Sequence, residues 1–137
     1  MFERYLVCED GFRNVRRGAE VIGFQVKSRI SYFRSMPLSM IEDVGVKVDG
    51  RSYAREQIRV GLRAGQFTLE QMKSRHDLRW QFAEDGVLTV LAPGGLAPGL
   101  HDVEVSQLLR LGLAALPPGQ AVLIPLSVGK RRMTLVV

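Results

Sequence analysis

The 137-residue chain has few of the side chains that form disulfides or bind transition metals. Cys8 is its one cysteine, so no internal disulfide can form, which fits a reducing compartment and predicts a cytoplasmic protein. The two histidines are His76 and His101, and their spacing from each other and from Cys8 matches no metal-binding pattern. We therefore expect this chain to hold no metal or other cofactor of its own.

Signals for export and for membrane insertion are also missing from the sequence. Residues 1–11 contain acidic side chains where a signal peptide needs basic ones followed by a long apolar core. Residues 111–129 carry no charge, but three prolines interrupt them and would leave backbone groups unpaired in lipid. We expect a turn followed by a buried strand in that stretch.

Long runs of Ala, Glu, Lys and Leu, which are typical of helix-rich proteins, do not occur either. Short apolar runs are instead cut by 14 glycines and 6 prolines, and 46% of the residues are hydrophobic. This composition is that of a globular protein, and the length fits one domain covering residues 1–137. The interrupted apolar runs favour a β-rich fold.

Alternation of apolar and polar residues predicts where the strands lie. Residues 20–34 alternate over a long stretch, which indicates a half-buried strand. Residues 44–48 alternate as well and end at Asp49 and Gly50, a common pair in hairpin turns. Further strands are expected in residues 58–62, 78–82, 87–92, 100–111, 121–128 and 130–137.

One short helix is expected at residues 68–74. Thr68 suits the N-cap position, and Gln71 stands three residues later, as in a capping box. Seven to nine short strands with one helical turn predict an all-β protein. We expect an antiparallel, Ig-like β-sandwich, in which each sheet buries one face and exposes the other.

The charge is basic, with a net value of +5 that comes almost entirely from arginine. Such a balance favours nucleic acid, an anionic surface or an acidic protein as a partner. The basic residues are spread among acidic ones, and only residues 130–132 form a run. Because no nucleic-acid recognition motif accompanies the charge, we favour a solvated surface over nucleic-acid binding.

No set of residues in the sequence resembles a catalytic site. Three Glu-Asp pairs occur, but neighbours within a strand point to opposite faces and cannot flank a substrate together. Residues 94–99 lack the lysine and hydroxyl residue of a phosphate-binding loop. We expect the chain to have no catalytic residue and to act by binding another molecule. The three Glu-Asp pairs considered as catalytic carboxylates are Glu9-Asp10, Glu42-Asp43 and Glu84-Asp85.

The segment SYFRSMPLSM, residues 31–40, is the best candidate for a binding surface. It is apolar and irregular, and it precedes a predicted strand. Aromatic residues, methionine and arginine are enriched in interface cores, so a partner interface is one interpretation. The other interpretation is a strand end followed by a loop that fills the core. The candidate interface residues are Tyr32, Phe33, Arg34, Met36, Pro37 and Met40.

Several stretches together resemble a known family. They are YLVCEDGFRNV (5–15), GFQVKSRISYFRSMPLSMIEDVGVKVDG (23–50) and KRRMTLVV (130–137). This pattern resembles the small β subunit of bacterial C-glycoside deglycosidases. The intervening LRWQF, GLAPGLHDVEV and AVLIPLSV fit the same pattern, so the resemblance extends over nearly the whole chain.

The resemblance implies a subunit of a hetero-oligomeric carbon–carbon lyase. In such enzymes a barrel-type α subunit carries a divalent metal, typically manganese, together with the acid/base residues. The β subunit is a β-sandwich without recognised catalytic residues, and it is expected to stabilise the α subunit and to help shape its active-site entrance. The complex cleaves the bond between a 3-oxo sugar and an aromatic aglycone such as a flavonoid. No catalytic or metal-binding residue is carried over to this chain.

Two other functions remain possible on the sequence alone. A stand-alone carbohydrate- or ligand-binding sandwich would need exposed aromatic residues, for which Tyr53 and Trp80 are candidates. Trp80 and Phe82, however, fall on the apolar side of strand 78–82 and are expected to face inward. A nucleic-acid binder is favoured by charge alone and would bind with steep salt dependence.

Overall fold

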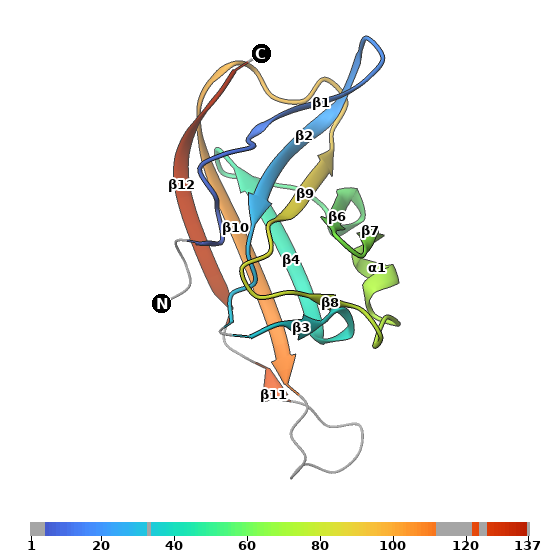
Figure 1. The fold of residues 1–137 in the computed structure, drawn as a ribbon. Coiled ribbons are helices and arrows are strands. Elements are labelled where there is room, and N and C mark those ends of the chain that lie inside the picture. Colours follow the sequence, from blue (N-terminus) through green and yellow to red (C-terminus); the bar gives the residue numbers. More distant parts are fainter. Residues whose placement is uncertain (1–4, 33, 112–121, 124–125, 137) are drawn as a thin grey trace.

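The computed structural model of the chain describes residues 5–32, 34–111, 122–123 and 126–136. Two antiparallel sheets lie face to face in it (Figure 1). The first sheet has the order β1 (Arg13–Arg17), β2 (Glu20–Ser28), β9 (Gly86–Leu91), β6 (Ile58–Leu62) and β7 (Gly65–Thr68). The all-β antiparallel sandwich predicted from the sequence is confirmed.

The second sheet is built around its longest strand, β10 (Gly99–Leu111). On one side of β10 lie β4 (Ile41–Val48) and then β5 (Arg51–Ser52). On its other side lie β12 (Ser127–Leu135) and β11 (Val122–Leu123). A separate small sheet pairs β3 (Met36–Pro37) with β8 (Arg79–Trp80) near the lower end of Figure 1.

The core lies between the two large sheets and follows the period-two pattern of the sequence. Phe24 and Val26 of β2 are buried, as are Val103 and Val105 of β10, while their neighbours along each strand are more exposed. Trp80 is also buried in this core. Burying one such side chain stabilises the fold by about 1.5–3 kcal/mol, so the core supplies the main driving force for folding.

Local turn and cap chemistry places two features where the sequence predicts them. Asp49 and Gly50 join β4 to β5 with positive φ angles of 51° and 83°, the conformation that a two-residue hairpin turn requires. Thr68 caps helix α1 (Leu69–Met72) by accepting a hydrogen bond from the Gln71 backbone N–H at 3.0 Å. The Gln71 side chain accepts from the Thr68 N–H at 2.9 Å, which completes the capping box.

Short elements account for the larger number of strands in the structure. Within the described ranges twelve strands occur rather than seven to nine, and four of them have two residues each. Two 3₁₀ turns, at Leu38–Met40 and Arg55–Gln57, are also present. None of the helices formed by described residues has the length and apolar character needed to cross a membrane.

Strand β2 ends at Ser28, six residues before the predicted end at residue 34. Beyond Ser28, backbone groups form hydrogen bonds with the side chain of Gln107, which is 1% exposed. Its Oε1 accepts from the Ser31 N–H at 2.9 Å, and its Nε2 donates to the Arg29 carbonyl at 2.9 Å. The backbone of Arg29 and Ser31 is therefore bound by a side chain of the second sheet.

The predicted inward position of Phe82 is wrong, because the chain turns directly after Trp80. The indole Nε1 donates to the Glu84 carbonyl at 3.0 Å, and Ala83 adopts a positive φ of 65°. The Glu84 N–H in turn donates to the Gln81 carbonyl at 3.1 Å. This turn ends β8 and leaves Phe82 57% exposed.

Replacing Gln107 with alanine should destabilise the protein by about 2 kcal/mol or more. The change leaves the buried Ser31 N–H and the Arg29 carbonyl without their partner. The free energy of unfolding in urea measures the loss. Gln66→Ala on the exposed side of β7 is the matched control and should stay within about 0.5 kcal/mol of wild type. Equal stability of the two variants would contradict this role for Gln107.

Candidate functional site

The carboxylates of the three Glu-Asp pairs are all engaged in holding the fold. Glu84 is buried and accepts hydrogen bonds from the backbone N–H groups of Arg63 at 2.7 Å and Gln81 at 3.0 Å. Four of the others accept hydrogen bonds from cationic side chains: Glu9 from Arg131 (2.8 Å), Asp10 from Lys27 (3.2 Å), Asp43 from Arg55 (3.0 Å) and Asp85 from Arg29 (2.8 Å). Glu42 forms an ion pair with Arg110 at 3.3 Å. Each of these carboxylates therefore contacts another part of the fold.

His101 joins two loops at one end of the second sheet. Its Nδ1 lies 2.6 Å from the Asp49 carboxylate and its Nε2 lies 2.6 Å from the Ala97 carbonyl oxygen. Both ring nitrogens thus face acceptors, an arrangement that the doubly protonated imidazolium satisfies best. The Ala97 carbonyl, followed by Asp49, raises the pKa of His101, although partial burial opposes this effect. The Asp102 N–H and His101 in turn lower the pKa of Asp49.

The remaining candidates for metal or nucleophile chemistry are separated from one another. Burial of the Cys8 thiol, as the main cause, raises its pKa, which disfavours the reactive thiolate. His76 is exposed, and its Nδ1 lies 3.0 Å from the Ser39 hydroxyl. Among the residues that the structure describes, no three His, Cys, Asp or Glu side chains are grouped so as to hold a metal ion.

Segment 31–40 lies at the β3–β8 end of the sandwich (Figure 1). Met36 is 2% exposed and lies in the core, which fits the interpretation of a core-filling loop. Tyr32 and Met40 are half-buried and pack against that core, and Pro37 is half-buried as well. Arg34 is exposed, and Phe33 lies outside the described residues. An interface role for the segment stays a prediction.

Neighbouring segments hold residues 38 and 39 in place. The backbone N–H groups of Leu38 and Ser39 donate to the carbonyls of Leu78 at 3.0 Å and Arg75 at 3.2 Å. The Ser39 carbonyl accepts from the Arg110 guanidinium at 3.1 Å. A surface that is already ordered loses less conformational entropy on binding than a mobile one does.

An apolar hollow beside residues 29–32 was not predicted from the sequence. Tyr5, Arg29, Ile30, Phe82 and Ala83 line it, and its volume is about 230 Å³. Phe82 and Tyr5 expose part of their rings there, while Arg29 lies 5.9 Å from the centre of the Tyr5 ring. We name it the Tyr5–Phe82 hollow. Sequence reasoning missed it because alternation placed Phe82 inside, although the glycine-containing turn at residues 84–86 was visible.

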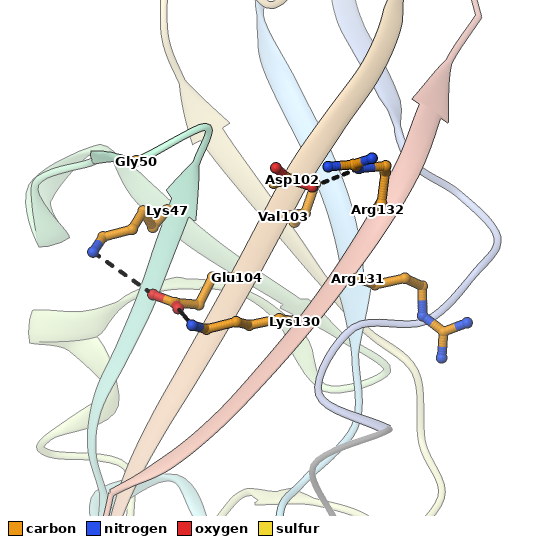
Figure 2. A pocket seen from close by; sticks show the side chains of 8 residues that line it. All are labelled: Lys47, Gly50, Asp102, Val103, Glu104, Lys130, Arg131 and Arg132. Atoms are coloured by element: carbon orange, nitrogen blue, oxygen red, sulfur yellow. Dashed lines mark hydrogen bonds and ion pairs between the residues drawn. The ribbon is translucent and has the colours of Figure 1, made fainter.

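The outer face of the second sheet carries a different, fully charged surface (Figure 2). A shallow depression of about 420 Å³ lies there over β4, β10 and β12. Glu104 is 3.9 Å from Lys47 and 3.4 Å from Lys130, and Asp102 is 2.9 Å from Arg132. Each of these three cations thus lies beside one of two carboxylates, as expected of a solvated surface.

The basic run at residues 130–132 is divided between two faces of β12. Figure 2 shows Arg131 directed away from Lys130 and Arg132. Its guanidinium donates to the Val7 carbonyl at 3.0 Å and to Glu9 at 2.8 Å, so it holds the segment that precedes β1. Alternation along the strand therefore prevents the run from acting as one basic patch.

The aromatic residues considered for carbohydrate binding form no exposed platform. Trp80 is completely buried, as the sequence predicts. Tyr53 is half-buried, with its ring edge-on to Phe24 at a centroid separation of 5.2 Å and Arg51 above it at 5.1 Å. The geometry gives no support to a sugar-binding role for these two residues.

Comparison with known protein families gives a clear match. The model of the C-glycoside deglycosidase beta subunit family matches residues 2–112. The chain belongs to this family. The resemblance seen in the sequence is thereby confirmed, and the match includes segment 31–40 and the Tyr5–Phe82 hollow of this beta subunit.

Two curated relatives support the assignment. A C-glycoside deglycosidase beta subunit of Eubacterium cellulosolvens is 34% identical over 103 residues, which cover 74% of this chain and 70% of the relative. A 3'-dehydrocarminate deglycosidase beta subunit of a Microbacterium species is 29% identical over 112 residues, which cover 81% of this chain and 80% of the relative. Both relatives are named as beta subunits of deglycosidases.

The stability of this beta subunit should depend on pH through His101. Since folding raises the pKa of His101, its contribution is complete below the unfolded value of about 6.5 and is lost as the pH rises through the folded value. Urea unfolding between about pH 5.5 and pH 8.5 should show this loss in wild type and not in His101→Gln. His76→Gln is the control and should follow wild type. Parallel curves for wild type and His101→Gln would contradict the prediction.

Proposed function

We propose that this chain is the non-catalytic beta subunit of a heteromeric C-glycoside deglycosidase. Membership of the beta subunit family is the observation that carries the proposal. The complex cleaves the carbon–carbon bond between a 3-oxo sugar and an aromatic aglycone, which is a lyase reaction. The ketone acidifies the neighbouring C–H bond, so a base can remove that proton and begin the elimination that expels the aglycone.

In this proposal the chemistry is carried out by another subunit. A barrel-type alpha subunit supplies the divalent metal, expected to be manganese, and the acid/base residues. A non-catalytic role for this chain is supported by the contacts of its Glu-Asp carboxylates, which bind cationic side chains or backbone N–H groups of the fold. It is further supported by the raised pKa of Cys8, which disfavours a nucleophilic role.

The role proposed for this chain is to stabilise the alpha subunit and to help shape its active-site entrance. The β3–β8 end offers the features of an interface: exposed Phe82 and Arg34, with Leu38 and Ser39 held by backbone hydrogen bonds to neighbouring segments. A typical interface buries about 800 Å² per partner, and a few aromatic or arginine anchors supply most of the affinity.

Activity should require both subunits. We expect a 3-oxo C-glucoside to be cleaved when this chain and the alpha subunit are co-expressed and purified together, and not by this chain alone. Release of the aglycone, measured by liquid chromatography, tests the proposal. Turnover by the purified beta subunit, or full activity of the alpha subunit without it, would contradict the proposal.

Removing an anchor at the β3–β8 end should weaken assembly. Phe82→Ala and Arg34→Ala should each cost about 2 kcal/mol, or roughly 30-fold in Kd for the alpha subunit. Both side chains are exposed, so the melting temperature of the isolated chain should change little. Leu100→Ala removes an equally exposed apolar residue from β10 and is the matched control. Unchanged affinity in both test variants would place the interface elsewhere.

A further inference from the structure

The positive charge of the protein is unevenly distributed between the two sheets. The strands of the first sheet contain five basic residues and one acidic residue, Glu20. The strands of the second sheet contain six basic and four acidic residues. Much of the net charge of +5 therefore belongs to the first sheet.

Pairing of charges increases the difference between the sheets. On the second sheet, Lys47, Lys130 and Arg132 each lie within ion-pair distance of Glu104 or Asp102. On the first sheet, four arginines form no ion pair with any residue that the structure describes. These four, which we name the arginine face, are Arg13, Arg16, Arg17 and Arg59.

Strand register places part of the arginine face on the outer side of the sheet. Arg13 pairs with Gln25, Gln25 with Thr89, and Thr89 with Arg59. Directly paired residues share a face, and the adjacent row, with Phe24, Val90 and Ile58, is buried in the core. The row from Arg13 to Arg59 therefore lies on the outer side of the sheet. Thr89 within it is buried, and the Arg59 guanidinium donates to the carbonyls of Glu56 at 2.7 Å and Ile58 at 3.2 Å.

The other two arginines stand at the exposed end of the β1–β2 hairpin. A register shift between Val15 and Arg16 interrupts the pairing, and a two-residue turn at Gly18 and Ala19 follows Arg17. Gly18 has a φ of 61°, which favours glycine at this tight turn. Arg16 and Arg17 are both exposed. The hairpin thus presents two cations at the end of the sandwich opposite to β3 and β8 (Figure 1).

We propose that the arginine face binds an acidic protein surface on the partner subunit. The inference rests on the proposed function, because the beta subunit family supplies the reason for a protein partner. Arginines without a carboxylate partner attract carboxylates, form paired hydrogen bonds with them and accelerate encounter with an oppositely charged surface. A second copy of this chain is disfavoured, since two arginine faces repel each other.

The β1–β2 hairpin, with Arg16 and Arg17, lies at the end of the sandwich opposite to β3 and β8, so the hairpin and the β3–β8 end contact different parts of the partner assembly. The arginine face acts mainly on the rate of association and on partner choice, as charges at the rim of an interface do. The apolar end supplies anchors that slow dissociation. This separation makes the two surfaces experimentally distinguishable.

The test compares two triple variants that both lower the net charge from +5 to +2. One is Arg13→Gln/Arg16→Gln/Arg17→Gln on β1. The matched control is Lys47→Gln/Lys130→Gln/Arg132→Gln on the opposite sheet. Binding to the purified alpha subunit is measured by biolayer interferometry at about 50 mM and about 300 mM NaCl, since the higher concentration screens exposed charges. Circular dichroism and gel filtration establish that each variant is folded and monodisperse.

We expect the β1 variant to associate with the alpha subunit about tenfold more slowly at low salt and to lose most of the salt dependence. The control should remain within about twofold of wild type, because each of its cations already lies within ion-pair distance of a carboxylate. Arg59→Gln is a second variant, on the interior strand β6 rather than on the edge strand β1, and it should also slow association with the alpha subunit. It keeps the proposal testable if the triple variant does not fold.

Three outcomes would overturn the proposal. Equal weakening of binding in the β1 variants and the control would make the effect one of net charge. Binding of the β1 variants at the wild-type rate would remove the arginine face from the interface while leaving the proposed function intact. Binding of wild type to a short DNA duplex and not to the alpha subunit would contradict the proposed function as well.

Discussion

The backbone hydrogen-bond ladders of β10 organise the second sheet and, through it, the whole molecule. This 13-residue strand pairs with β4 on one side and with β12 on the other, while alternate side chains such as Val103 and Val105 point into the core. The same strand supplies Gln107, whose amide group fixes residues 29–32. The position of segment 31–40 therefore depends on a strand far away in sequence.

Features set by local chemistry could be predicted from the sequence. The Asp49-Gly50 turn needs only residues that tolerate positive φ, and the cap of α1 needs only Thr68 and Gln71. The strand pattern follows from alternation, since every second residue of a half-buried strand must be apolar. These are contacts between residues a few positions apart, which is why one sequence suffices to find them.

Features set by distant contacts could not be predicted in the same way. The end of β2 depends on Gln107, about 76 residues further along the chain, and nothing near Ser28 indicates it. The exposure of Phe82 depends on a hydrogen bond from the Trp80 indole and on the unusual backbone of Ala83. For the candidate site, exposed Arg34 could be predicted from residue type, whereas the burial of Met36 and the Tyr5–Phe82 hollow required the tertiary structure.

The contact between Arg131 and the segment before β1 has a consequence for synthesis of the chain. Leu6 and Val7 are buried, and the Val7 carbonyl and Glu9 are held by a guanidinium 122 to 124 residues away. Residues 6 and 7 leave the ribosome well before residue 131 does, and contacts of such long sequence separation form late. The contact of Arg131 with this segment consequently forms only after the closing strand has been synthesised, whereas the backbone hydrogen bonds that join Cys8 to Lys27 and Arg29 to Tyr5 need only early residues.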